Sequence, residues 1–137
     1  MSIQTIETQI EALVAEVTEV QAVYDYPVAE LGRKLPALVV LYDGFGQDFE
    51  ATRQTDTTYR WELSLYWAAE GRTLEDVWDL VKTTVPLILN KFRQSPQLNG
   101  AVWGSILRSG EPIIEVVNDL PRVIGHSFLL EATQTET

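Results

Sequence analysis

The first twenty residues have the hydrophobic pattern of an amphipathic α-helix. Apolar side chains recur at steps of three and four residues, which places them in one stripe on a helix. They are Ile3, Ile6, Ile10, Leu13, Val14, Val17 and Val20. Glutamates occupy the other side of the same helix, and Ser2 can cap its start. Pro27 disfavours helical backbone at Tyr26, so we expect the helix to end before this pair.

Two later segments have the patterns of β-strands. Residues 37–42, Ala-Leu-Val-Val-Leu-Tyr, are a short apolar run that is typical of a strand buried on both faces. In residues 59–67, large apolar side chains alternate with more polar ones, which predicts a strand with one face on the core and the other facing water or a neighbouring subunit. The apolar set is Tyr59, Trp61, Leu63, Leu65 and Trp67, and the other set is Arg60, Glu62, Ser64 and Tyr66. Residues 43–57 are polar and glycine-containing, which predicts a long, exposed hairpin loop.

A second helix and three further strands are predicted for the rest of the chain. Residues 73–76, Thr-Leu-Glu-Asp, resemble a capping box and begin a helix that should end before Ser95. Its apolar stripe is Leu74, Val77, Trp78, Val81, Val85, Ile88, Leu89 and Phe92. Pro86 lies inside this stripe and should kink or divide the helix. The strands are expected at residues 101–108, 111–117 and 122–132, with breaks at Ser109-Gly110 and Asn118-Asp119 and a frayed tail from Thr133 to Thr137.

These elements predict an α+β protein. A mixed, mostly antiparallel sheet with two helices packed on one face buries all the apolar stripes with the fewest elements. The long first β-hairpin loop is the least economical feature of this plan. Because no internal repeat or interdomain linker interrupts the pattern, we expect residues 1–137 to form a single α+β domain.

Charge narrows the range of partners. The chain has 10 basic and 20 acidic residues, a formal net charge of −10, and Arg33-Lys34 is its only adjacent basic pair. Duplex DNA and anionic membranes attract clustered Lys and Arg, so neither is expected as a surface partner. Solubility is the simplest explanation of the acidic surplus.

The compartment is indicated by what the sequence lacks. There is no cysteine, which excludes disulfides, thiolate nucleophiles and cysteine-based metal sites. Residues 1–5 have neither the basic nor the apolar region of a signal peptide. No apolar run approaches the ~20 residues that span a bilayer. We expect a cytoplasmic protein without a membrane partner.

The groups that could act as base or nucleophile have simpler explanations. The one histidine, His126, shares a predicted strand face with Ile124, Phe128 and Leu130, so it is expected to be packed or at an interface. Ser105 lacks the second glycine of a nucleophile elbow.

Phosphate and metal sites are no better supported. Gly44-Phe45-Gly46 lacks the third glycine and the basic residue of a phosphate loop, and Asp48 would repel phosphate. The acids between Asp43 and Asp56 lack the spacing of a calcium loop. We therefore expect a non-enzymatic protein with no catalytic residue, no cofactor and no metal site.

Aromatic side chains are the remaining candidates for a functional role in this sequence. Trp67 and Trp78 lie in apolar stripes and are expected in the core. Trp103 and Tyr66 have polar neighbours, and both core packing and an interface role remain open for them. Two aromatics in a polar loop, Phe45 and Phe49, either contact another protein or fold back onto the core of their own subunit.

Residues 35–44, Leu-Pro-Ala-Leu-Val-Val-Leu-Tyr-Asp-Gly, follow an amphipathic amino-terminal helix and resemble the start of bacteriophage tail-terminator and tail-completion proteins. A polar loop, an aromatic strand, a helix and terminal strands follow in the same order, so the resemblance of layout covers nearly the whole chain. It implies a structural virion protein of the tail or neck, assembled in the host cytoplasm. Such a subunit forms a homo-oligomeric ring, expected to be a hexamer, which caps the tail tube protein, stops tube polymerisation and joins the head connector or adaptor protein. DNA is implied only as cargo that passes through the lumen. Six copies would sum to a formal charge of roughly −60, and an acidic lumen would repel DNA phosphates rather than hold them.

A ring requires a heterologous contact, in which one face of a subunit meets a different face of the next. One candidate half is the outward side of the aromatic strand, at Arg60, Glu62 and Tyr66. The other is the polar loop, and Trp103 is a further candidate. The loop residues proposed to contact the tube or the neighbour are Phe45, Gln47, Asp48, Phe49, Glu50 and Arg53. Two alternatives stay open: a head–tail adaptor on the portal side, and a regulatory domain that binds a small molecule.

Overall fold

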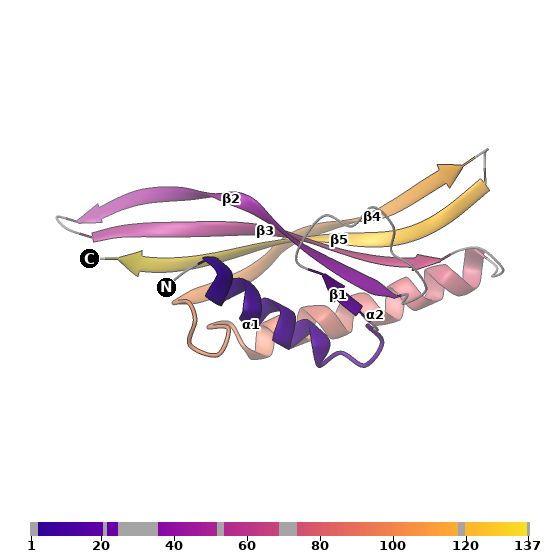
Figure 1. Cartoon of the computed structure of the whole chain (residues 1–137), viewed down its shortest axis with the longest axis horizontal. Coiled ribbons are helices and arrows are strands. Elements are labelled where there is room, and N and C mark those ends of the chain that lie inside the picture. Colours follow the sequence, from indigo (N-terminus) through magenta and orange to yellow (C-terminus); the bar gives the residue numbers. More distant parts are fainter. Residues whose placement is uncertain are drawn as a thin grey trace.

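The computed structural model describes residues 3–20, 22–24, 36–51, 54–68, 74–117 and 120–136. Two helices and five strands follow one another along the chain. They are α1 (Ile3–Ala15), β1 (Ala22–Tyr24), β2 (Ala37–Ala51), β3 (Gln54–Ala68), α2 (Leu74–Gln94), β4 (Gly104–Val117) and β5 (Leu120–Glu136). One sheet has the strand order β1-β2-β3-β5-β4; β1 is parallel to β2 and the other pairs are antiparallel. Both helices lie against the same face of this twisted sheet (Figure 1). The predicted α+β fold with a mixed, mostly antiparallel sheet and two helices is confirmed.

The core lies between the helices and the face of the sheet that they cover, which we call the helix side. The alternation predicted for residues 59–67 places Trp61, Leu63, Leu65 and Trp67 there, all buried. The stripes of the two helices meet them with buried Ile6, Ile10, Leu13, Val14, Val77, Val81, Ile88 and Phe92. Each such side chain contributes roughly 1.5–3 kcal/mol when fully removed from water. The amphipathic pattern of the sequence therefore determines which surfaces of the helices and the sheet meet.

The apolar run of β2 is buried on both faces. Leu38 and Val40 face the helix side opposite Leu65 and Leu63, and Ala37 and Val39 face the other side, which we call the far side. All four are buried. The prediction of a strand without an exposed face is therefore confirmed for Ala37–Val40, while Tyr42 at the end of the run is 39% exposed.

Helix α2 is continuous from Leu74 to Gln94, with Pro86 inside it. Of the two outcomes expected for Pro86, a kink or a division, the division is wrong. Acids in the first turn and Lys91 and Arg93 in the last turn complement the helix dipole. No helix in the described ranges is long and apolar enough to cross a membrane.

The predicted exposed loop at residues 43–57 is wrong. Strands β2 and β3 continue through it and pair at Phe45↔Tyr59, Gln47↔Thr57 and Asp48↔Asp56. A register shift between Tyr42 and Phe45, with Gly44 at a φ of 98°, lets the strand continue past the Asp43-Gly44 break. Beyond the helices, these strands are held by backbone pairing and not by burial of side chains, so their sequence shows no alternation of apolar and polar residues.

The predicted frayed tail is also wrong. Strand β5 runs to Glu136, and its last residues pair with β3 at Thr57↔Gln134 and Thr55↔Glu136. The ends of β2, β3 and β5 thus form a three-stranded extension beyond α1 (Figure 1). We call this extension, residues 45–51, 54–59 and 132–136, the arm.

One strand occupies the place of two predicted ones. Strand β4 passes through Ser109-Gly110 without a turn, with only a register shift between Leu107 and Ser109. A Cβ at Gly110 would collide with the backbone oxygen of Ser127. The absence of a side chain at Gly110 therefore allows β4 to approach β5 closely. Residues 101–103, predicted as strand, form a turn before it.

Candidate subunit-contact surfaces

Two strand edges have no partner strand within the described part of the chain. Strand β4 is the last strand of the sheet, so no described strand pairs with its outer edge. At the opposite side, the short β1 pairs with residues 37–39 of β2, and no other described strand pairs with this edge of β2 from Val40 onward. Free edges present backbone N–H and C=O groups that can pair with another chain. These two edges belong to different strands and differ in their side chains.

The β4 edge is apolar. Trp103 just before β4 is 70% exposed, and Ile106 and Ile114 within it are 52% and 51% exposed. The Trp103 amide donates to the carbonyl of Thr133, which attaches this segment to β5. Large apolar side chains at an unpaired strand edge are the composition expected of a protein contact. Pro112 and the irregularity at Leu107 limit where another strand could pair.

A groove of about 320 Å³ lies between the end of α2 and this edge. It is lined mainly by Leu89, Phe92, Arg93, Pro96, Ile106 and Leu107. The hydroxyl of Ser105 donates to the carbonyl of Pro96 at 2.8 Å, which fixes the connection between helix and strand. We call this feature the α2–β4 groove; its floor is apolar and Arg93 supplies its positive charge.

The arm has an aromatic residue on its helix side and acids along its free edge. Phe45 is opposite Tyr59 and therefore on the helix side, yet it is 57% exposed. Gln47 donates from its amide nitrogen to the Thr57 hydroxyl at 3.2 Å on the same side. The exposed charges of β2 in the described part are acidic, at Asp43 and Asp48. Phe45 therefore does not pack into the core of its own subunit, which was one of the two alternatives.

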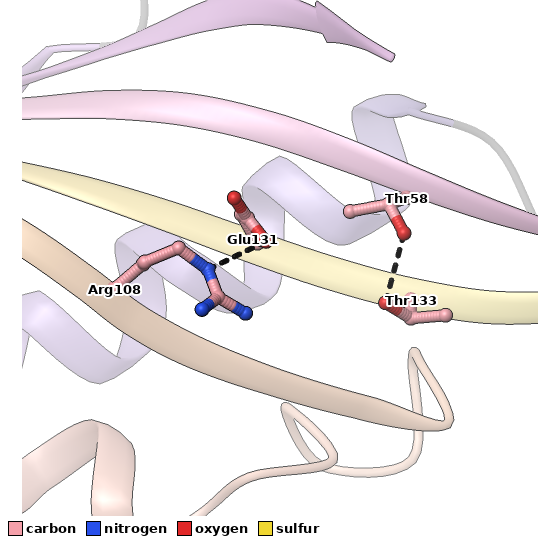
Figure 2. A network of polar contacts seen from close by, with 4 residues as sticks. All are labelled: Thr58, Arg108, Glu131 and Thr133. Atoms are coloured by element: carbon pink, nitrogen blue, oxygen red, sulfur yellow. Dashed lines mark hydrogen bonds and ion pairs between the residues drawn. The ribbon is translucent and has the colours of Figure 1, made fainter. Parts of the chain in front are cut away.

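Arg60 and its neighbours make a polar network on the far side. Arg60 lies over Gly44 and Gly46 and donates to the carbonyl of Phe45 at 3.3 Å. Next along the sheet, Arg108 pairs with Glu131 at 2.9 Å and the hydroxyls of Thr58 and Thr133 are 3.1 Å apart (Figure 2). Exposed ion pairs of this kind stabilise a fold by about 0–1 kcal/mol. Arg60 is therefore engaged in its own subunit rather than freely extended.

The far side also has an acidic hollow of about 360 Å³. Its lining includes the carboxylates of Asp43, Glu62 and Glu111, with Ser127 and Leu129. The Ser64 hydroxyl donates to Glu62 at 3.4 Å. No group of three or more His, Asp or Glu side chains in the described ranges could hold a metal ion. The hollow would repel a phosphate, and the hydroxyl of Ser127 donates to the backbone carbonyl of Glu111 at 3.3 Å.

His126 is packed on the helix side. It is half-buried, and its ring centroid lies 4.9 Å from that of Phe128. Burial lowers the pKa of His126 below 6.5, and a hydrogen bond with the backbone at Ser127 partly opposes this. The ring also lies over Gly110, where a Cβ would be 2.9 Å from its Cε1. These contacts are those of a packed histidine.

The predicted contact residues do not form one surface. Arg60, Glu62 and Tyr66 point to the far side, where Tyr66 is half-buried opposite Gly125. Phe45 and Gln47 point to the helix side of the arm.

The remaining predicted contact residues are spread more widely. Asp48 is exposed on the far side of the arm, and Trp103 lies at the start of β4. Phe49 and Glu50 belong to β2, but their side chains lie outside the described part of the structure, as does Arg53 altogether.

Sequence reasoning missed the apolar β4 edge and the groove beside it. Ile106 and Ile114 were assigned to strands, but nothing local indicates that β4 lies at an edge of the sheet. The order of strands is decided by contacts between distant segments. The signal that could have been used is Pro112, because a proline within a predicted strand favours an edge position.

Comparison with protein families found no family model that matches this chain. A search of curated proteins likewise found no match.

Proposed function

We propose that the chain is a structural subunit that assembles with copies of itself into a ring, and that this ring is the terminator of a bacteriophage tail. The observation that carries the proposal is the pair of unlike surfaces at opposite edges of one sheet. A ring needs two different, complementary surfaces on each subunit. The apolar β4 edge with its groove and the acidic arm with Phe45 are such a pair.

The tail-terminator role rests on the resemblance of residues 35–44 and of the order of elements to that family. In this proposal the ring caps the tail tube protein and presents its other surface to the head connector. The acidic far-side hollow agrees with a lumen through which DNA passes without binding. Retention of DNA by the assembled ring at physiological salt would contradict this part of the proposal.

The test begins with the mass of the purified full chain, measured by light scattering across a range of concentrations, and with electron micrographs of the same samples. We expect a uniform ring. Added to polymerising tail tube protein, the chain should shorten the tubes and bind at one end. A chain that stays monomeric and leaves tube length unchanged would refute the proposal.

A head–tail adaptor on the portal side is the second candidate, because it too would be built from unlike surfaces. The two roles differ in the protein that is bound. Pull-down with tube protein against pull-down with connector protein separates them, and binding to the connector alone would favour the adaptor.

A further inference from the structure

We infer that the partner of the β4 edge is the arm of a second copy, with Phe45 of that copy entering the α2–β4 groove and its β2 edge lying beside the first half of β4. This inference rests on the proposed ring and specifies its contact. It assigns a donor surface, centred on Phe45, and an acceptor surface made by Leu107 and Arg93 of the groove and by the strand edge at Ile106, whose side chain points to the far side.

Backbone pairing supplies the first argument. The described part of the chain leaves the edge of β2 from Val40 onward and the outer edge of β4 without partner strands, and these edges lie at opposite sides of the sheet. Joining the two continues one sheet from copy to copy. Neither edge has to pair with itself, so the contact is head to tail.

The direction of Phe45 supplies the second argument. It points to the helix side of its own sheet, opposite Tyr59, and more than half of its surface is exposed. The groove lies on the helix side too, because Leu107 is opposite buried Leu130 and the other wall is α2. When two sheets are continuous with their helices on the same side, an aromatic of one copy faces the groove of the next. Buried aromatics in a pocket are the commonest anchors of protein contacts.

Charge indicates which half of β4 contacts the arm of the second copy. The β2 edge brings Asp43 and, within the arm, Asp48. The groove holds Arg93, and the adjacent β4 position is Arg108, which pairs with Glu131 of its own subunit but keeps 57% of its side chain exposed. Further along β4 comes the exposed Glu111, which would repel the arm. For a chain of net charge −10, most pairs of surfaces repel, so a contact that places acids beside arginines is favoured. The contact is therefore expected over residues 103–108 rather than 111–117.

The experiment uses full-length variants that disable one or the other of the two surfaces. Phe45→Asp removes the donor and Ile106→Asp the acceptor; Arg93→Glu is a second acceptor variant on an exposed helix position, in case the strand substitution disturbs folding. Each is expected to weaken self-association on the order of 30-fold or more, as loss of a central anchor does. Far-UV circular dichroism and melting temperature verify that each variant is folded.

Mixing gives the decisive result. A Phe45→Asp copy retains its acceptor and an Ile106→Asp or Arg93→Glu copy retains its donor, so an equimolar mixture should form a one-to-one dimer and nothing larger. Ile114→Asp is the control, because Ile114 is as exposed as Ile106 on the same strand and, like the groove, lies on the helix side, but it belongs to the other half of β4. This control should still assemble like the wild type.

The outcomes separate the inference from the proposed function. Rings that survive Phe45→Asp, mixtures that give no dimer, or an Ile114→Asp variant that fails to assemble would overturn the inference and leave the ring standing. A wild-type chain that is monomeric throughout would overturn both.

Discussion

The indole Nε1 of Trp61 donates a hydrogen bond to Oε1 of Glu7 at 3.1 Å, which joins the middle of the sheet to helix α1. Trp61 is fully buried, and its ring also contacts Tyr42 at 5.8 Å and Tyr59 at 6.1 Å between centroids. A buried indole N–H without an acceptor costs about 1–3 kcal/mol. Glu7, which belongs to the polar side of the predicted helix, therefore contributes to the core.

Glu7→Ala is expected to lower the free energy of unfolding by about 1–2 kcal/mol, because it leaves the indole without its acceptor. Glu7→Gln keeps an oxygen in place and should cost less than half as much. Urea denaturation of both variants measures the difference. Equal stability of Glu7→Ala and wild type would show that the hydrogen bond contributes nothing.

Gly110→Ala should destabilise the fold by about 1–3 kcal/mol, since the new Cβ would collide with the backbone oxygen of Ser127 and β4 would have to move. Gly104→Ala is the control on the same strand, because a Cβ there has no atom within 4 Å. Thermal unfolding of the two variants makes the comparison. Similar melting temperatures for both would contradict the close approach of β4 and β5.

The stability of the protein should decrease as the pH falls below about 6.5, in part through His126. Burial lowers the pKa of His126 in the folded state, so the unfolded chain binds the proton more tightly. Its contribution is present above pH 6.5 and is lost as the pH falls toward the lowered pKa.

His126→Gln removes this dependence. Unfolding free energies of wild type and His126→Gln, measured at several pH values from 7.5 to about 5, should converge as the pH falls. Curves that stay parallel over that range would show that His126 has the same proton affinity in both states.

Backbone amides of residues 133–136 should exchange slowly with solvent deuterium, because these residues pair with β3 in the arm. Hydrogen-exchange mass spectrometry of the full chain tests this, with the paired residues 127–131 of β5 as the internal reference. Exchange of the last residues at the rate of an unstructured peptide would support the frayed tail that their polar sequence predicted.

The sequence predicted those parts of the fold in which burial of one face makes apolar residues recur at a regular spacing. The helical stripe of α1 and the alternation around Trp61 follow from the need to cover one core, and both are confirmed. The apolar run at Ala37–Val40 was assigned to a doubly buried strand for the same reason.

The remaining elements could not be predicted because the forces that hold them leave no local pattern. Residues 45–51 and 133–136 are strands through pairing with neighbours, which any polar side chain permits. Gly110 suggested a break between two strands, whereas it lies within β4 and leaves room for the backbone oxygen of Ser127 on β5. The identity of the edge strands depends on sheet order, so the exposed Ile106 could not be singled out beforehand.

The twist of the sheet has a consequence for how many copies an assembly can hold. If copies are joined strand to strand, each junction adds a rotation of roughly 20–25° between neighbouring strands, with a fixed hand. Whether the chain of copies returns to its start or winds on as an open spiral is then decided by that accumulated rotation and by how far each junction is tilted. The irregularity between Leu107 and Ser109 lies where this tilt would be set. Substitutions there are expected to change the number of subunits in a closed assembly more than the strength of any single junction.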